Sequence, residues 1–224
     1  TSYLHTDWYI DQMKKQAYTS SPLPISWTRA DYVQGTRDAA YVFPITDQPV
    51  DLGTALDFVK SNDPKFKTIP GISQKLDYIP SQTIVYNVDS AAVLANHALD
   101  TAYVPQMLKQ MTIDLKGKDA LGKQELIILD MLHTNNWKRP IYYAITVSPD
   151  QFVKLDKYFQ QTGMAYQIVP LETTDKSNSV NTARMYDNVM NKFHWGGVDK
   201  KGIYIDETVM RMCKSHRIAL FGKL

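Results

Sequence analysis

The sequence has a single cysteine, Cys213, among its 224 residues. One cysteine excludes a disulfide within the chain and any metal site that needs several thiolates. The cysteine count does not determine the cellular compartment, because proteins of oxidising compartments can also lack disulfides. No hydrophobic run approaches the roughly 20 residues that a membrane-spanning helix requires. We therefore expect residues 1–224 to be soluble.

Several enzyme motifs are also missing. The sequence contains no GxxxxGK[ST], no GxGxxG after a strand, no HExxH and no GxSxG. The five histidines, at positions 5, 97, 133, 194 and 216, do not have the spacing of metal ligands. We therefore expect no cofactor and no metal site, and the sequence leaves open whether the chain is an enzyme.

The sequence also lacks a strong excess of either positive or negative charge. The 25 basic and 23 acidic residues are spread along the chain and leave a formal net charge of +2, so we expect no nucleic-acid partner. With 44% hydrophobic residues, 14 tyrosines and only 10 glycines, the composition favours a packed α/β protein. The length favours a single domain over residues 1–224.

The clearest local pattern lies between about 141 and 171. IYYAITV, 141–147, is typical of a buried strand, and Ser148-Pro149-Asp150-Gln151 then resembles a capping-box helix start. Apolar residues follow at helical spacing, Gly163 suits a C-cap, and AYQIVPL, 165–171, indicates a second strand. This order predicts a βαβ unit with parallel strands.

Helices and strands alternate elsewhere too. Asp51 and Asn181 precede apolar residues at helical spacing, and Asp206 precedes a helix with Arg211, Lys214 and Arg217 on one side. The spans RDAAYVFPI, QTIVYNV and MTIDL indicate strands, and GKQELIILDMLHT, 122–134, indicates a buried helix. The sequence therefore predicts an α/β fold with a mostly parallel or mixed sheet flanked by helices.

The block NNWKRP, 135–140, permits two interpretations. As a joint between a helix and a strand, its asparagines tolerate the left-handed conformation and its cations complement the helix dipole. As a site, it offers an indole, two amides and a guanidinium suited to a sugar or an anion. The joint is the favoured interpretation. The candidate ligand-binding residues of this block are Asn135, Asn136, Trp137 and Arg139.

Two further blocks contain candidate site residues. In TDWYID, 6–11, Thr6 is a predicted N-cap, and Asp7 and Asp11 share one helical face beside Trp8. Such carboxylates could bind a cation or act as acid and base, but they more often complement the helix dipole. In the stretch 180–199, the predicted apolar face leaves over Asp187, Asn188, Asn191, His194 and Trp195. A site there would use Asp187, Asn188, His194 and Trp195, but a lone histidine in such a place is more often a packing residue than a catalyst.

Five blocks together resemble a known family: LHTDWYIDQMKK, YIP, NNWKRPIYYA, YFQQTGMAYQIVP and VNTARMYDNVMNKFHWGGVDKKGIYIDE. The chain is similar, over its whole length, to the soluble C-terminal region of the DUF2723 proteins (domain of unknown function 2723). These are multi-pass bacterial membrane proteins related to GT-C protein O-mannosyltransferases. The resemblance implies a cell membrane protein, with this domain on the periplasmic side. It also implies that an N-terminal transmembrane region and C-terminal helical repeats lie outside this chain.

The resemblance carries over no catalytic residue, so several hypotheses remain. In the first, the chain is a non-catalytic accessory domain that binds a glycan or a protein acceptor, with its own membrane-embedded region as partner. In the second, it is an independent hydrolase or transferase that uses Asp7, Asp11 or Asp187 with His194. In the third, it is a purely structural protein-interaction module.

Overall fold

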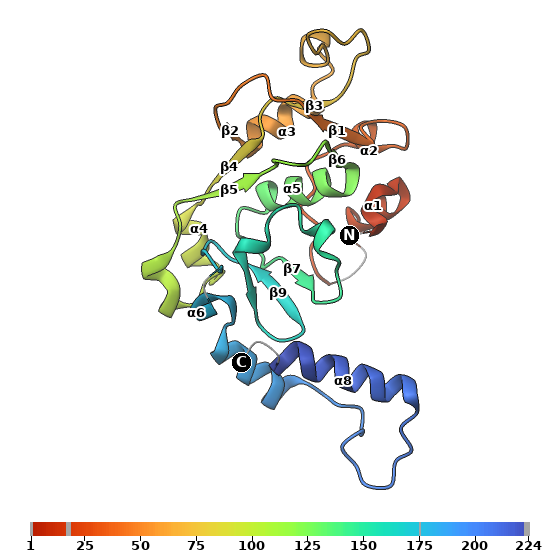
Figure 1. The fold of residues 1–224 in the computed structure, drawn as a ribbon, viewed down its shortest axis with the longest axis vertical. Coiled ribbons are helices and arrows are strands. Elements are labelled where there is room, and N and C mark those ends of the chain that lie inside the picture. The colour runs from red at the N-terminus through yellow and green to blue at the C-terminus, as the bar shows by residue number, and fades with distance from the viewer. Residues whose placement is uncertain (1, 17–18, 175, 222–224) are drawn as a thin grey trace. The chain divides into compact units, whose positions relative to one another are not determined.

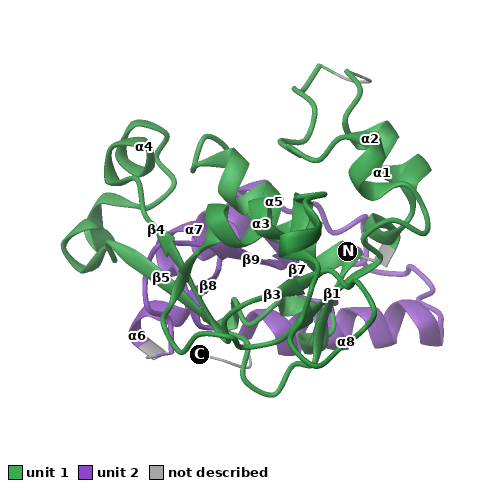
Figure 2. Ribbon diagram, turned by 90° about the horizontal axis from the view of Figure 1, so that it is seen from above, with its two compact units in different colours: residues 1–139, 148–156 green, residues 140–147, 157–224 purple. Residues whose placement is uncertain are grey.

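The computed structural model describes residues 2–16, 19–174 and 176–221. Their contacts divide the chain into two compact units, which Figure 2 colours separately. Unit 1 comprises residues 1–139 and 148–156, and unit 2 comprises residues 140–147 and 157–224. The expectation of a single domain over residues 1–224 stays a prediction.

Unit 1 combines helices with two small mixed sheets (Figure 1), so the α/β class with mixed sheets flanked by helices is confirmed. Its α-helices are α1 (Asp7–Met13), α2 (Arg29–Tyr32), α3 (Leu52–Lys60), α4 (Ser90–Ala95) and α5 (Lys123–Asn135). Its strands are β1 (Ala39–Val42), β2 (Val50–Asp51), β3 (Tyr78–Ile79), β4 (Thr83–Asn87), β5 (Gln110–Asp114) and β6 (Ala120–Gly122). Its short 3-10 helices are η1 (Ser2–His5), η2 (Pro64–Phe66), η3 (Thr101–Gln106) and η4 (Pro149–Phe152).

Each sheet of unit 1 has one parallel and one antiparallel pair. In the order β3-β1-β6, β1 runs parallel to β3 and antiparallel to β6. In the order β2-β4-β5, β4 runs parallel to β2 and antiparallel to β5, with Ile84 opposite Ile113. Both of these isoleucines are fully buried, so this pairing register places apolar side chains in the core of unit 1.

Helix α5 is the central element of unit 1. It contacts α3, β1 and β6, and consecutive apolar residues around its circumference are buried: Leu126, Ile127, Ile128, Leu129 and Leu132. A helix that is apolar on all sides is stable in water only when other elements surround it. The prediction of a buried helix over 122–134 is therefore confirmed, within one residue at each end.

A polar contact in this apolar setting fixes residues 25–27 against α5. The buried carboxylate of Asp130 accepts hydrogen bonds from the backbone N–H of Ser26, at 2.7 Å, and from its hydroxyl. The ammonium of Lys14, just after α1, donates to the carbonyls of Ile25 and Trp27. Burial raises the pKa of Asp130, although the Ser26 hydrogen bonds and the charge of Lys60 oppose the rise. Residues 25–27 are thus bound from both α1 and α5.

Unit 2 contains one antiparallel sheet and several helices (Figure 1). Its strands β7 (Tyr142–Ala144), β8 (Phe159–Gln161) and β9 (Ala165–Ile168) pair in the order β7-β9-β8. Its helices are α6 (Lys176–Ser179), α7 (Thr182–Asp187), the π-helix η6 (Asn188–Lys192) and α8 (Glu207–Phe221). The short 3-10 helix η5 (Asp156–Tyr158) begins in unit 1 and ends in unit 2.

The predicted βαβ unit at about 141–171 is wrong. β7 and β8 both run antiparallel to β9, and no α-helix lies between 141 and 171. The Ser148-Pro149 start signal does form a turn of 3-10 helix, but Val153 and Lys154 then adopt positive φ angles of 55° and 58°. A left-handed pair ends a helix. The apolar residues of the predicted helical face are buried from other structures, Val153 and Leu155 from an irregular segment, Tyr158 from η5 and Phe159 from β8, and Phe152 is half-buried.

Three predicted helix starts are confirmed by hydrogen bonds. The carboxylate of Asp51 accepts from the N–H of Thr54, the amide oxygen of Asn181 accepts from Arg184, and Asp206 accepts from Val209. Each bond satisfies an N–H that the first helical turn leaves without a partner. Thr6 also precedes a helix, but its hydroxyl donates to the carbonyl of Tyr3 and does not cap α1.

Among the described residues, no helix is long and apolar enough to cross a lipid bilayer.

We predict that the Asp130–Ser26 contact is a major local contribution to stability. Asp130→Ala removes an acceptor of two hydrogen bonds and should lower the free energy of unfolding by about 2–3 kcal/mol. Asp130→Asn should lower the free energy of unfolding by less, because the amide oxygen still accepts a hydrogen bond from Ser26 and no charge is buried. Urea denaturation of both variants measures these costs, and an equal loss in the two would contradict the prediction.

The raised pKa of Asp130 also predicts a pH dependence. A carboxyl whose pKa is higher in the folded chain than in the unfolded chain binds its proton more tightly when the chain is folded. Its contribution to the free energy of unfolding is therefore complete below its pKa in the unfolded chain and is lost as pH rises through its pKa in the folded chain. The free energy of unfolding of the natural chain should therefore fall relative to that of Asp130→Asn as pH rises from about 3 to about 7. Denaturation of both chains across this range tests the sign, and a difference that grows with pH contradicts it.

Candidate functional site

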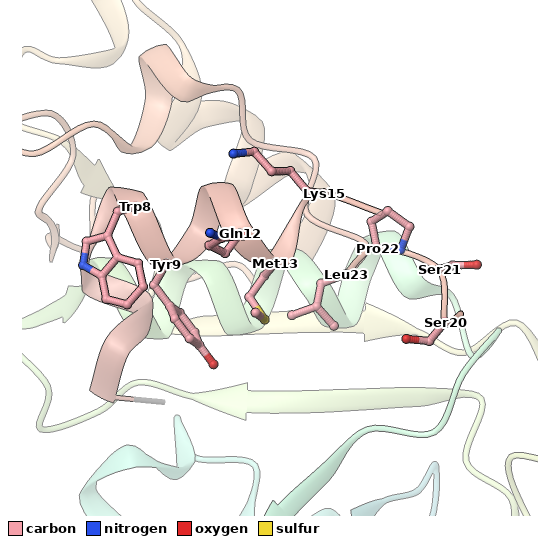
Figure 3. Close-up of a pocket in the computed structure, with 9 residues that line it drawn as sticks. All are labelled: Trp8, Tyr9, Gln12, Met13, Lys15, Ser20, Ser21, Pro22 and Leu23. Atoms are coloured by element: carbon pink, nitrogen blue, oxygen red, sulfur yellow. The ribbon is translucent and has the colours of Figure 1, made fainter. Parts of the chain in front are cut away.

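A hollow of unit 1 that contains a predicted site residue, Trp8, lies between α1 and residues 20–23. It has a volume of about 430 Å³. In Figure 3, the indole of Trp8 lies at one end of the lining and Ser20 and Ser21 lie at the other. The full lining is Trp8, Tyr9, Gln12, Met13, Lys15, Ser20, Ser21, Pro22 and Leu23. We call this hollow the α1 pocket.

The wall opposite α1 is fixed by hydrogen bonds from two directions. The backbone N–H of Leu23 donates to the carbonyl of Met13 at 2.9 Å, which joins residues 20–23 to the end of α1. The guanidinium of Arg139 donates to the carbonyls of Ser21 and Pro22 at 2.8 and 2.9 Å. A guanidinium has five donors in a rigid fork, so it can hold two successive carbonyls at once. Arg139 therefore shapes the α1 pocket without being part of its lining.

The lining combines an apolar floor with polar groups at its rim. Trp8 is 59% exposed and packs edge-to-face against Tyr9, so part of its surface remains open to a ligand. Met13 and Leu23 are half-buried, and Gln12, Lys15, Ser20 and Ser21 are exposed. Together they provide an aromatic face, an amide, an ammonium and two hydroxyls. Such a pocket can bind a neutral polar ligand that also has an apolar face.

The NNWKRP block forms the end of α5. Asn136 has φ 40° and ψ 51°, the left-handed conformation at the helix C-cap, and its amide donates to the carboxylate of Asp89 at 3.0 Å. Asn135 is buried, with its side chain hydrogen-bonded to the backbone N–H and carbonyl of Arg139. The structure thus uses both amides to shape the joint, as the favoured interpretation predicts.

Trp137 belongs to the core of unit 1. Its indole is 4% exposed and stacks on the ring of Tyr86, with centroids 6.0 Å apart. Burial, with a smaller contribution from Asp89, raises the pKa of Tyr86 to about 12, so this phenol stays neutral at physiological pH. A ligand on the surface cannot stack on an indole in this position, and Trp137 acts here as a packing residue.

The carboxylates of α1 are matched by a cation. Arg29 forms ion pairs with Asp7, at 3.6 Å, and with Asp11, and the hydroxyl of Tyr32 donates to Asp11 at 2.7 Å. These contacts join α1 to α2. They give both carboxylates a structural role, and their use in catalysis stays a prediction.

The candidate residues of unit 2 lie in and after η6. Asp187 pairs with Lys192 at 2.6 Å and accepts from the amide of Asn191, and hydrogen bonds from both residues lower its pKa. The amide of Asn188 donates to the carbonyl of Thr162 at 2.6 Å. His194 is exposed. The contacts of Asp187 and Asn188 thus stabilise η6 and its junction with the end of β8.

Trp195 differs from its neighbours because it lines a hollow. This hollow of unit 2 has a volume of about 450 Å³ and is bounded by residues 195–205 and by α8. Among its lining residues are Met210, Leu220 and Phe221. The hollow is mainly apolar, and we call it the α8 pocket.

The structure therefore brings together only part of the predicted site. Trp8 lines the α1 pocket and Arg139 supports it, whereas Asn135, Asn136 and Trp137 form the helix joint. Sequence reasoning did not identify the pocket wall at 20–23. No local pattern indicates that a guanidinium more than a hundred residues later would hold these carbonyls.

In the part of the chain that the structure describes, no three histidine, cysteine, aspartate or glutamate side chains are grouped in a way that could hold a metal ion.

The family called TMEM260-associated domain 2 matches residues 1–187, and the chain belongs to this family. No curated protein and no solved structure matches the chain significantly. The family is named for its association with TMEM260, a transmembrane protein by name, so this chain is a domain associated with a membrane protein.

The assignment to DUF2723 is wrong, because the matching family is TMEM260-associated domain 2. The blocks quoted for that resemblance are real features of the sequence, but they do not identify that family. The GT-C relationship and the periplasmic side were implied by that resemblance alone, and they lose their support with it. The family match does not show the side of the membrane.

Trp137 is buried and Trp8 is exposed, so replacing each with alanine should change the free energy of unfolding by different amounts. Trp137→Ala empties a buried site and should lower the free energy of unfolding by about 3–5 kcal/mol. Trp8→Ala removes an exposed side chain and should change it by about 0.5 kcal/mol or less. Denaturant titration followed by circular dichroism measures both, and similar costs for the two variants would contradict these assignments.

Proposed function

We propose that this chain is an accessory binding domain of a membrane protein and that its α1 pocket binds a glycan. The observation that carries the proposal is the exposed indole of Trp8 beside a rim of amide, hydroxyl and ammonium groups. The membrane-protein context comes from the family to which the chain belongs.

The aromatic end of the α1 pocket suits one face of a sugar ring. A pyranose presents C–H groups on its face and hydroxyls at its edge, and the C–H groups pack against the electron-rich face of an aromatic ring. Trp8 provides such a ring, and its edge contact with Tyr9 limits its rotamers before a ligand binds. A side chain that is already ordered loses less entropy on binding.

The polar groups along the α1 pocket suit the sugar hydroxyls. Gln12, Ser20 and Ser21 can each donate and accept hydrogen bonds, and Lys15 can donate. The carbonyls of Ser21 and Pro22 already accept from Arg139, so the wall is held in place before a ligand arrives. The lining residues come from one helix and one adjacent segment, so unit 1 contains the whole proposed site.

Isothermal titration calorimetry with oligosaccharides tests the proposal. We expect saturable binding of at least one hexose oligosaccharide from a panel that includes mannose and N-acetylglucosamine oligomers. Trp8→Ala should weaken that binding by about tenfold or more, equivalent to about 1.4 kcal/mol. Arg139→Ala should weaken it as well, because the wall at 20–23 loses its support although no lining residue changes.

A matched control is Trp195→Ala, which removes another exposed indole from unit 2 and should leave glycan affinity unchanged. Binding that survives Trp8→Ala, or that is lost equally in Trp195→Ala, contradicts the assignment to the α1 pocket. Failure of every oligosaccharide to bind a folded chain contradicts the glycan itself.

A further inference from the structure

The segment that leads into α8 exposes large aromatic and apolar side chains. Tyr204 is 90% exposed, and Ile203 and Trp195 are also exposed. Figure 1 shows the chain running outward after η6 and then returning along α8 within unit 2. Exposed side chains of this size cost free energy in water, and when they cluster they mark a binding surface.

Positive charge accumulates on the same segment. Between 195 and 221 there are five lysines and arginines and three acidic residues, which leaves 20 of the 25 basic and 20 of the 23 acidic residues for the rest of the chain. The segment therefore carries the whole excess of positive charge. Lys200 and Lys201 are exposed and precede Ile203 and Tyr204 by two to four residues, so two ammonium groups lie near these exposed side chains.

Helix α8 continues this pattern along one face. Arg211, Lys214, Ile218 and Phe221 follow one another at i, i+3, i+7 and i+10, a spacing that aligns them on one side of a helix, and all four are exposed. Only Leu220 of α8 is buried, next to Val180 and Met185. The helix is thus attached to unit 2 through a small core near its C-terminal end.

We propose that this surface, formed by residues 195–204 and the exposed face of α8, binds an anionic lipid bilayer. Aromatic side chains are favoured at the level of the lipid headgroups, because their rings are apolar and their polar atoms remain hydrated. Each lysine or arginine near an anionic surface adds about 1 kcal/mol of attraction. On this face of α8, the long side chains of Arg211 and Lys214 can reach the lipid phosphates while Ile218 and Phe221 contact the apolar part of the headgroup region.

A protein partner fits the same surface less well. The centres of protein–protein interfaces are depleted in lysine, because its ammonium is costly to desolvate. Here lysines lie beside the most exposed aromatic and apolar residues, where a lipid headgroup region would leave them hydrated and near phosphate. Charge complementarity therefore favours the bilayer over a protein partner or a second copy of the chain.

Vesicle flotation of the whole chain tests the proposal. Vesicles of phosphatidylcholine mixed with phosphatidylglycerol should carry the chain, vesicles of phosphatidylcholine alone should carry much less, and added salt should weaken the binding. Arg211→Ala/Lys214→Ala should lower the partition coefficient about 20–30-fold, from about fivefold per basic residue. Ile203→Ala/Tyr204→Ala should lower it several-fold without changing the charge.

The matched control is Lys75→Ala/Lys109→Ala, which removes the same charge from exposed positions of unit 1 and should leave more of the binding intact. All substituted side chains are exposed, and circular dichroism verifies that each variant folds. No flotation, equal flotation with neutral vesicles, or the same loss in the control and the α8 variant would overturn the proposal. A concentration-dependent dimer lost in the same variants, without vesicle binding, would assign the surface to a second copy.

Discussion

The carboxylate of Asp130, buried in the middle of α5, is the contact on which the arrangement of unit 1 depends. It binds the N–H and hydroxyl of Ser26 while Lys14 binds the carbonyls on either side, so a segment without secondary structure is held on both edges. A buried charge is costly unless hydrogen bonds compensate it, and these bonds offset part of the cost of burying Asp130. Residues 25–27, which precede α2, are consequently fixed where an unbound loop would be free.

The α1 pocket is a consequence of this constraint. Residues 20–23 precede the held segment, and Arg139, four residues beyond the end of α5, binds two of their carbonyls. Helix α5 therefore positions one wall of the pocket through Asp130 and Arg139, while α1 provides the other wall. The side chains that hold this scaffold lie outside the lining of the pocket: Asp130 is buried, Lys14 and Arg139 are half-buried, and Ser26 is exposed.

The sequence predicted those features that depend on local contacts. Side-chain caps at Asp51 and Asn181, the buried helix α5 and the left-handed Asn136 all follow from neighbouring residues. The βαβ unit was predicted wrongly because a helical start signal and apolar spacing say nothing about Val153 and Lys154, whose left-handed backbone is set by packing. The contact between Arg139 and residues 21–22 is equally non-local, so the pocket could not be predicted although Trp8 and Arg139 were both candidates.

The most direct test of the account is to map the backbone and indole N–H chemical shifts of the chain during titration with an oligosaccharide that binds it. The account predicts that the perturbed groups are the Trp8 indole, Gln12 and residues 20–23, with Leu23 among them through its bond to α1. Perturbations centred on Trp195, or spread over both units without a maximum at α1, would contradict it.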